Sequence, residues 1–216
     1  EVDNSWTIVF WRSLFAALFL LGFMLWRDGP RGTVVLFKGM GLAGLGVALC
    51  FAIASSSFVV ALAYTTVANI LLMQAGVPLI AALLTWTLFR ERISGATWAA
   101  IAAVIAGVAI MVSESFTGKV SPIGDGLALL ISVMFAIATV ITRRHAHVRM
   151  TPAVCLGTIL AACFAGLLAG HYAVSAADLG WLVAFGALNL GLGLVMFTTG
   201  VRLLPAALAA LVGTLE

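Results

Sequence analysis

Apolar residues occur along this chain in long, unbroken runs separated by short polar segments. Each run has about 20 residues or slightly more, the length that an α-helix needs to cross the hydrocarbon core of a bilayer. The runs are apolar on every face of a helix, whereas the strands of a membrane barrel alternate apolar and polar residues. The pattern predicts an all-α integral membrane protein, a polytopic helical bundle. The runs cover residues 6–26, 39–63, 66–89, 95–113, 123–142, 152–170 and 178–201, and a further run begins at 206.

Composition supports the same class of protein and excludes most others. Apolar types make up 63% of the 216 residues and charged types 9%, where a soluble domain carries about 25% charged residues. This leaves no room for a sizeable soluble domain or a nucleic-acid module. We expect the partners to be the lipid bilayer and a small-molecule solute. Cys50, Cys155 and Cys163 lie in the apolar runs and are interpreted as small apolar side chains.

The basic residues predict the orientation of the chain. If successive runs cross the membrane, nine Lys and Arg residues lie on one side and Lys119 lies on the other. Cytoplasmic loops retain Lys and Arg, so residue 1 is predicted outside an inner (plasma) membrane. Arg12, near the start of the first run, is expected to extend toward the interface. The nine residues on the predicted cytoplasmic side are Arg27, Arg31, Lys38, Arg90, Arg92, Arg143, Arg144, Arg149 and Arg202.

A weak internal repeat is present. One shift aligns Gly41 with Gly180 and Phe58 with Phe197, so that the paired runs of 39–89 correspond to 178–216. The shift crosses an odd number of runs, which gives the two copies opposite orientations. Inverted repeats of this kind are common in secondary transporters.

Several segments resemble the EamA family of the drug/metabolite transporter superfamily. Residues 61–78 read ALAYTTVANILLMQAGVP, and residues 88–93 read LFRERI, similar to the family's Gly-Glu-Arg helix end with Arg90 in place of Gly. In the second half, GDGLALL from Gly124 and RLLPAALAALVGTLE from Arg202 are similar to the corresponding pattern.

The resemblance implies a ten-helix fold of two inverted five-helix repeats. Family helices two to nine would then lie in this chain, with the first helix upstream and the ninth cut. Residues 1–113 would form the first repeat and 123–216 the second. The implied function is export of small organic metabolites, amino acids with aromatic or neutral side chains above all, by alternating access and without a cofactor.

Uncharged polar residues inside the runs are the candidates for a substrate cavity. Asn and Gln are costly against lipid and usually face protein or water. Asn69, Gln74 and Asn189 therefore either line a cavity or bond a neighbouring helix, and Asn69 and Gln74 are about 140° apart on one helix. For Ser56, bonding to its own helix backbone is the stronger interpretation.

Four further residues complete the candidate site. Pro78 interrupts an apolar run, and broken helices often face a transport path, although a structural kink is an equal alternative. Tyr64 and Met73 either contact a ligand or pack in the core. Of the eight acidic residues, Glu216 alone is assigned to the interior of a run, which makes it a functional candidate.

Other functions are less well supported by the residues. A sugar-phosphate carrier of the same superfamily would need intramembrane Lys or Arg, and only Arg12 and Arg202 lie near run ends. A membrane enzyme lacks acidic clusters and paired histidines for catalysis or metal binding, and a passive structural subunit would not need the repeat. The glycines of 39–44, which spell GxGxxG, and those of 166–170 are interpreted as sites of close helix packing.

Overall fold

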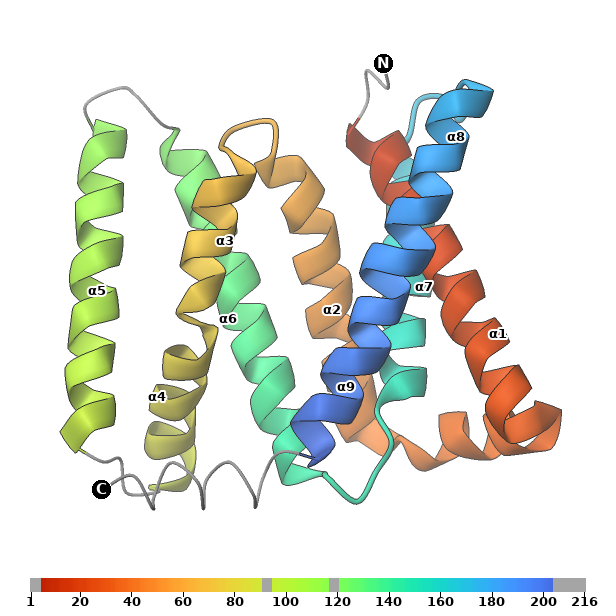
Figure 1. Ribbon diagram of the computed structural model, residues 1–216, viewed down its shortest axis with the longest axis horizontal. Helices are drawn as coiled ribbons and strands as arrows, with labels where there is room; N and C mark the ends of the chain where they lie inside the picture. The colour runs from red at the N-terminus through yellow and green to blue at the C-terminus, as the bar shows by residue number, and fades with distance from the viewer. Residues whose placement is uncertain (1–4, 91–94, 117–120, 204–216) are drawn as a thin grey trace. The chain divides into compact units, whose positions relative to one another are not determined.

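The computed structural model describes residues 5–90, 95–116 and 121–203, with side chains described for 5–90, 95–110 and 121–200. These residues form helices and contain no strand (Figure 1). Six helices or continuous helical stretches are long and apolar enough to cross a membrane, and Gly95–Ile110 is a shorter apolar helix. The all-helical, membrane-spanning class predicted from the sequence is confirmed.

The helices follow the predicted apolar runs closely, and the run that begins at 206 lies outside the described residues. In chain order they are α1 Ser5–Gly39, α2 Gly41–Ala61, α3 Val67–Ala75, α4 Val77–Phe89, α5 Gly95–Phe116, α6 Pro122–Arg144, α7 Thr151–Leu168, α8 Ala176–Val183, the π-helix η1 Ala184–Leu192 and α9 Gly193–Leu203.

Helix α1 continues well beyond the predicted end of its apolar run at residue 26. It bends at Gly29, whose φ of 70° and ψ of 173° are not helical. Such a φ costs glycine little because it has no Cβ. Pro30 then begins a second helical segment, a position where its missing N–H is not needed. Residues 30–39 are therefore helical (Figure 1), where the sequence had suggested a loop.

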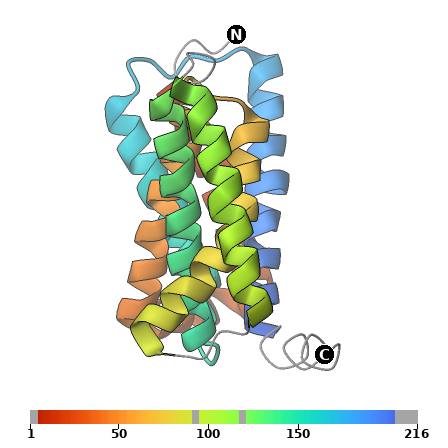
Figure 2. The ribbon, with the colours of Figure 1, turned by 90° about the vertical axis from the view of Figure 1, so that its left-hand side faces the viewer.

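The run predicted at 66–89 forms two helices that meet at Gly76. Pro78 lies in the first turn of α4, where proline is tolerated. A Cβ on Gly76 would lie 3.0 Å from the Val104 side chain of α5, so a close approach accompanies the break. Figure 2 shows α4 running obliquely to α5. The predicted interruption is confirmed, and it falls just before the proline.

The chain forms two compact units, and each contains parts of both predicted repeats. The first unit comprises Glu1–Ala52 with Ile141–Glu216, and the second comprises Ile53–Val140. In the first unit, α1 packs along α7 and against η1. A Cβ on Gly157 of α7 would lie 2.7 Å from the Ala48 carbonyl oxygen of α2, so these two backbones nearly touch.

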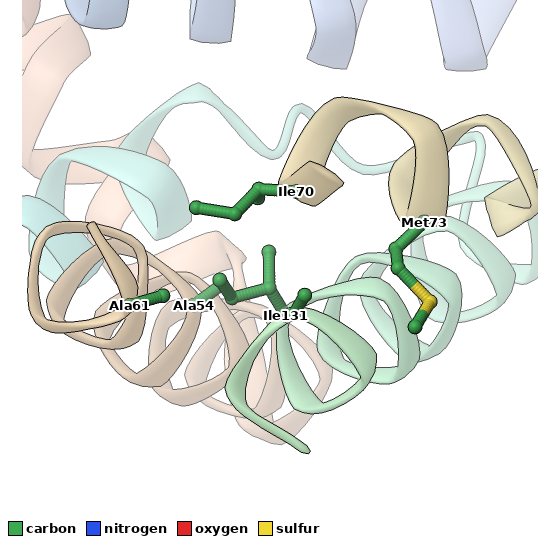
Figure 3. Close-up of a cluster of buried hydrophobic side chains, with 6 residues drawn as sticks. Ala54, Ala61, Ile70, Met73 and Ile131 are labelled. Atoms are coloured by element: carbon green, nitrogen blue, oxygen red, sulfur yellow. The ribbon is translucent and has the colours of Figure 1, made fainter. Parts of the chain in front are cut away.

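The core of the second unit lies between α2, α3 and α6. Figure 3 shows Ile70 and Met73 of α3 and Ile131 of α6 within this cluster. All three side chains are almost fully buried, with at most 3% of their surface exposed. This core holds α3 against the start of α6, where the polar residues described below meet.

The glycine motifs differ from prediction in part. Gly166 packs against Phe10 of α1, as expected for close helix packing. Gly39, Gly41 and Gly170 have no heavy atom within 4 Å of an added Cβ, so they are not packing sites. Gly41 instead has a φ of 56° and turns the chain between α1 and α2.

Candidate functional site

A cluster of polar side chains joins α3 to α6 in the second unit. The Asn69 side-chain amide donates one hydrogen bond to Asp125 Oδ1 at 2.7 Å and another to Thr65 Oγ1 at 2.9 Å. An amide NH₂ has two hydrogens and can make both bonds at once. We call Thr65, Thr66, Asn69 and Asp125 the Asn69–Asp125 cluster.

The turn before α3 places Asn69 in this position. Thr66 is the N-cap residue of α3, and its hydroxyl accepts a hydrogen bond of 3.2 Å from the Asn69 backbone N–H. Threonine at this position satisfies one of the N–H groups that a helix start leaves unpaired. The cap therefore fixes the backbone of Asn69 while its side chain reaches toward α6.

The start of α6 fits against the same turn because residue 124 is glycine. A Cβ at Gly124 would lie 2.7 Å from the Thr65 Cβ and 3.0 Å from the Tyr64 carbonyl oxygen. Real Cβ atoms essentially never approach other atoms as closely as the first of these distances. The neighbouring Asp125 is thereby brought within hydrogen-bond distance of Asn69.

Asp125 is a carboxylic acid buried inside a membrane-spanning helix, with 4% of its surface exposed. It lies in the first turn of α6, where the unpaired N–H groups of a helix favour negative charge. Its carboxyl group accepts a hydrogen bond from Asn69. Carboxylate groups are also common partners of cationic N–H groups.

The prediction that Glu216 is the one acid inside an apolar run is wrong. Asp125 falls within the run 123–142 and is buried in α6. The signal was present in the sequence, because an acid three residues into an apolar run is costly and marks a functional candidate. Glu216 lies outside the described residues.

Three predicted cavity residues lie within or close to the core of the second unit. Met73 is 3% exposed and belongs to the hydrophobic cluster of Figure 3, which accords with the packing interpretation. Ser56 of α2 is buried, and Gln74 of α3 is half-buried. The carbonyl of Gln74 accepts from the Gly76 N–H at the break between α3 and α4.

The remaining candidates are more exposed. Tyr64 lies in the turn between α2 and α3 with 45% of its surface exposed, beside the Asn69–Asp125 cluster. Pro78 is exposed at the start of α4. Asn189 is exposed on η1 in the first unit. The structure thus places Tyr64 on the turn that precedes Asn69, and Asn189 on a different compact unit.

Arg12, which the sequence predicts to extend toward the interface, is covered by protein. Its side chain is buried in α1 with 4% exposed, and its guanidinium carbon lies 5.4 Å from the centre of the Phe185 ring on η1. Guanidinium groups are attracted to the faces of aromatic rings. Next to it, Ser13 is fully buried, and its hydroxyl has no hydrogen-bond partner among the described residues. Arg12 is therefore a cation buried within the first unit.

Close packing of α1 against η1 buries this arginine. A Cβ on Gly186 would lie 2.5 Å from the Arg12 carbonyl oxygen and 2.8 Å from the Phe15 Cβ. Glycine therefore lets the two backbones approach, as small residues do between membrane helices. π-Helical segments are rare and occur frequently at functional sites. The first unit thus contains a buried cation beside an irregular helix.

No group of three or more His, Cys, Asp or Glu residues within the described parts of the chain is arranged to hold a metal ion. Two buried charged side chains are the candidates for binding a ligand: Asp125 in the second unit and Arg12 in the first.

The long apolar helices define a multi-pass membrane protein. The EamA-like transporter family matches residues 1–113, which is more than half of the chain. The protein therefore belongs to this family, and it is a membrane transporter of the drug/metabolite transporter superfamily. Comparisons with curated proteins and with solved structures gave no match.

Proposed function

We propose that this transporter exports amino acids with neutral or aromatic side chains. The observation that carries the proposal is the buried Asp125 carboxylate, held by Asn69 in the second unit. An amino acid presents an ammonium group, which is a cation with N–H donors. A carboxylate in a region of low dielectric constant attracts such a group more strongly than it would in water.

The surroundings of Asp125 suit a ligand with an apolar side chain. Tyr64 is exposed at the adjoining turn, and its ring can contact an aromatic or aliphatic group. Ligand sites are lined mainly by apolar and aromatic side chains, with a few polar groups that set the orientation. In this proposal Asp125 binds the ammonium group of the substrate, and Asn69 holds the Asp125 side chain in place. Tyr64 contacts the apolar side chain of the substrate.

Transport would proceed by alternating access between two inverted repeats, residues 1–113 and 123–216. Broken and irregular helices support this mechanism, because transporters commonly place them at the substrate path. The break at Gly76 and the π-helix η1 are two such irregularities. The distribution of Lys and Arg supports an inner-membrane orientation with residue 1 outside, so that export moves solute away from the Arg-rich loops.

Flux measurements in proteoliposomes test the proposal. Vesicles loaded with labelled Phe, Trp or Thr are expected to release the label faster when they contain the protein. Asp125→Asn keeps the shape of the side chain but removes its charge, and is expected to slow release at least tenfold. Asp178→Asn is the matched control, because Asp178 also lies in the first turn of a helix but in the other unit.

Two outcomes would contradict the assignment. Absence of protein-dependent flux for every amino acid would refute the substrate class. Equal flux in Asp125→Asn and the unmodified protein would refute the role of Asp125 in binding the ammonium group.

The burial of Arg12 favours a second candidate, an organic anion such as a sugar phosphate. Such an anion needs a cation within the helical bundle, and the Arg12 guanidinium is buried beside Phe185. Arginine binds carboxylate and phosphate with paired hydrogen bonds. Protein-dependent release of labelled glucose 6-phosphate, lost in Arg12→Gln, would support this candidate over amino acids.

A further inference from the structure

The helical segment 30–39, after the bend in α1, has the features of a membrane-surface helix. Figure 1 shows this segment running crosswise to the first part of α1. Its orientation is fixed at both ends. Gly29 and Gly41 turn the chain before and after it, and Asp28 forms an ion pair of 2.6 Å with Arg149. The segment is also tied to the bend, because the Thr33 hydroxyl donates to the Gly29 carbonyl.

One face of the segment is exposed and the other is covered by protein. With about 100° between successive residues, Arg31, Val34, Val35 and Lys38 share one half of the helix surface. All four are exposed, Val34 by 54% and Val35 by 67%. Thr33 is buried on the opposite half. The exposed face therefore combines two cations with two apolar side chains.

The residues next to this segment also combine exposed apolar and basic side chains. Trp26 is 84% exposed and Arg27 is exposed just before the bend. The Asp28–Arg149 pair also brings the connection between α6 and α7 to this end of the first unit, and exposed Arg143 and Arg144 precede that connection. The one acidic residue between Trp26 and Lys38, Asp28, is neutralised by Arg149. The surface carries a net positive charge.

This combination matches the boundary between lipid headgroups and acyl chains. Trp side chains are enriched at that depth, and Lys and Arg extend their charged ends to the headgroups while their stems cover apolar surface. An acidic protein partner would be attracted by the charges, but it would leave the exposed valines and Trp26 without the hydrocarbon that the bilayer provides. The charge and the apolar groups are both satisfied by an anionic lipid leaflet.

We propose that the 30–39 segment lies in the membrane surface and binds anionic phospholipid headgroups through Arg31 and Lys38. The leaflet is the one on the Arg-rich side, which is the cytoplasmic leaflet in the predicted orientation. The proposal is independent of the transported substrate.

Lipid binding to the purified full chain tests the charge component. After delipidation, native mass spectrometry compares retention of phosphatidylglycerol and phosphatidylcholine. Arg31→Gln is expected to lower phosphatidylglycerol binding about fivefold, which corresponds to about 1 kcal/mol for one basic residue at an anionic surface. Lys119→Gln is the control, because Lys119 is the basic residue that the sequence predicts on the opposite side of the membrane. Equal losses in the two variants, or no loss in Arg31→Gln, would overturn the proposal.

The depth of the segment is tested separately with a fluorescent probe on Val35→Cys. The probe is attached in a Cys163→Ser background, because Cys163 is exposed whereas Cys50 and Cys155 are buried. In phosphatidylglycerol vesicles, we expect stronger quenching by phospholipids spin-labelled at the upper acyl chain than by a water-soluble quencher. Strong quenching by the water-soluble quencher, with none by the spin-labelled phospholipids, would show that the segment faces solvent or a soluble partner and would overturn the proposal.

Discussion

Replacing Gly124 with alanine tests how the Asn69–Asp125 cluster is assembled. The added Cβ would lie 2.7 Å from the Thr65 Cβ and 3.0 Å from the Tyr64 carbonyl oxygen. Carbon atoms in favourable contact are about 3.5–4.0 Å apart, so the turn and α6 must separate by about 1 Å. Overpacking of this kind costs about 1–3 kcal/mol. The Asn69–Asp125 hydrogen bond of 2.7 Å would be stretched as a result.

Gly126→Ala provides the control, because Gly126 lies in the same helix with no heavy atom within 4 Å of an added Cβ. Both variants gain about the same helix propensity, roughly 0.5–1 kcal/mol. The difference between their free energies of unfolding therefore isolates the steric term, and we expect Gly124→Ala to be about 1–3 kcal/mol less stable. Unfolding by sodium dodecyl sulfate in mixed micelles, followed by circular dichroism, measures both values.

Transport by the same pair of variants gives a second measurement. Gly124→Ala is expected to lose flux together with stability, while Gly126→Ala retains both. If the two variants unfold at the same detergent fraction, the close approach of α6 to the α2–α3 turn is refuted.

Asn69→Ala removes two hydrogen bonds, including one to a buried carboxylate, and is expected to lower the free energy of unfolding by about 1–2 kcal/mol. Asn189→Ala, at an exposed position, is expected to leave the free energy of unfolding unchanged. If neither Asn69→Ala nor Asn189→Ala alters transport, the assignment of both residues to the substrate cavity is wrong. Gly186→Ala places a Cβ 2.5 Å from the Arg12 carbonyl oxygen and is expected to cost about 1–3 kcal/mol. Gly193→Ala, with no atom within 4 Å, is its control in the same unfolding assay, and equal stabilities would contradict the packing of η1 on α1.

Much of the fold follows from hydropathy alone. The runs from 6–26 to 178–201 each correspond to a helix or to consecutive helices. Whether a segment of about 20 residues prefers lipid to water depends on its own composition, so no knowledge of neighbouring helices is needed. The interruption near Pro78 was also readable, because proline acts locally on the backbone.

The bend at Gly29 and the helix 30–39 were not readable in this way. Pro30 and the flanking Arg27, Asp28 and Arg31 have the composition of a loop. Just before the segment, Asp28 is paired with Arg149, which lies far away in the chain, and hydropathy alone does not predict such a contact.

In the candidate site too, local properties could be predicted from the sequence and contacts between distant residues could not. Asn69 was identified because a side-chain amide is costly against lipid whatever surrounds it. Asp125 could have been identified in the same way, as an acid within the run 123–142. Its bond to Asn69 could not be predicted, since it joins residues 56 positions apart and depends on Gly124 fitting against Thr65. The burial of Arg12 could likewise not be predicted, because it depends on the approach of η1 at Gly186. Transfer into the membrane is a property of each segment, whereas the environment of a buried charge is set by whichever helices pack around it.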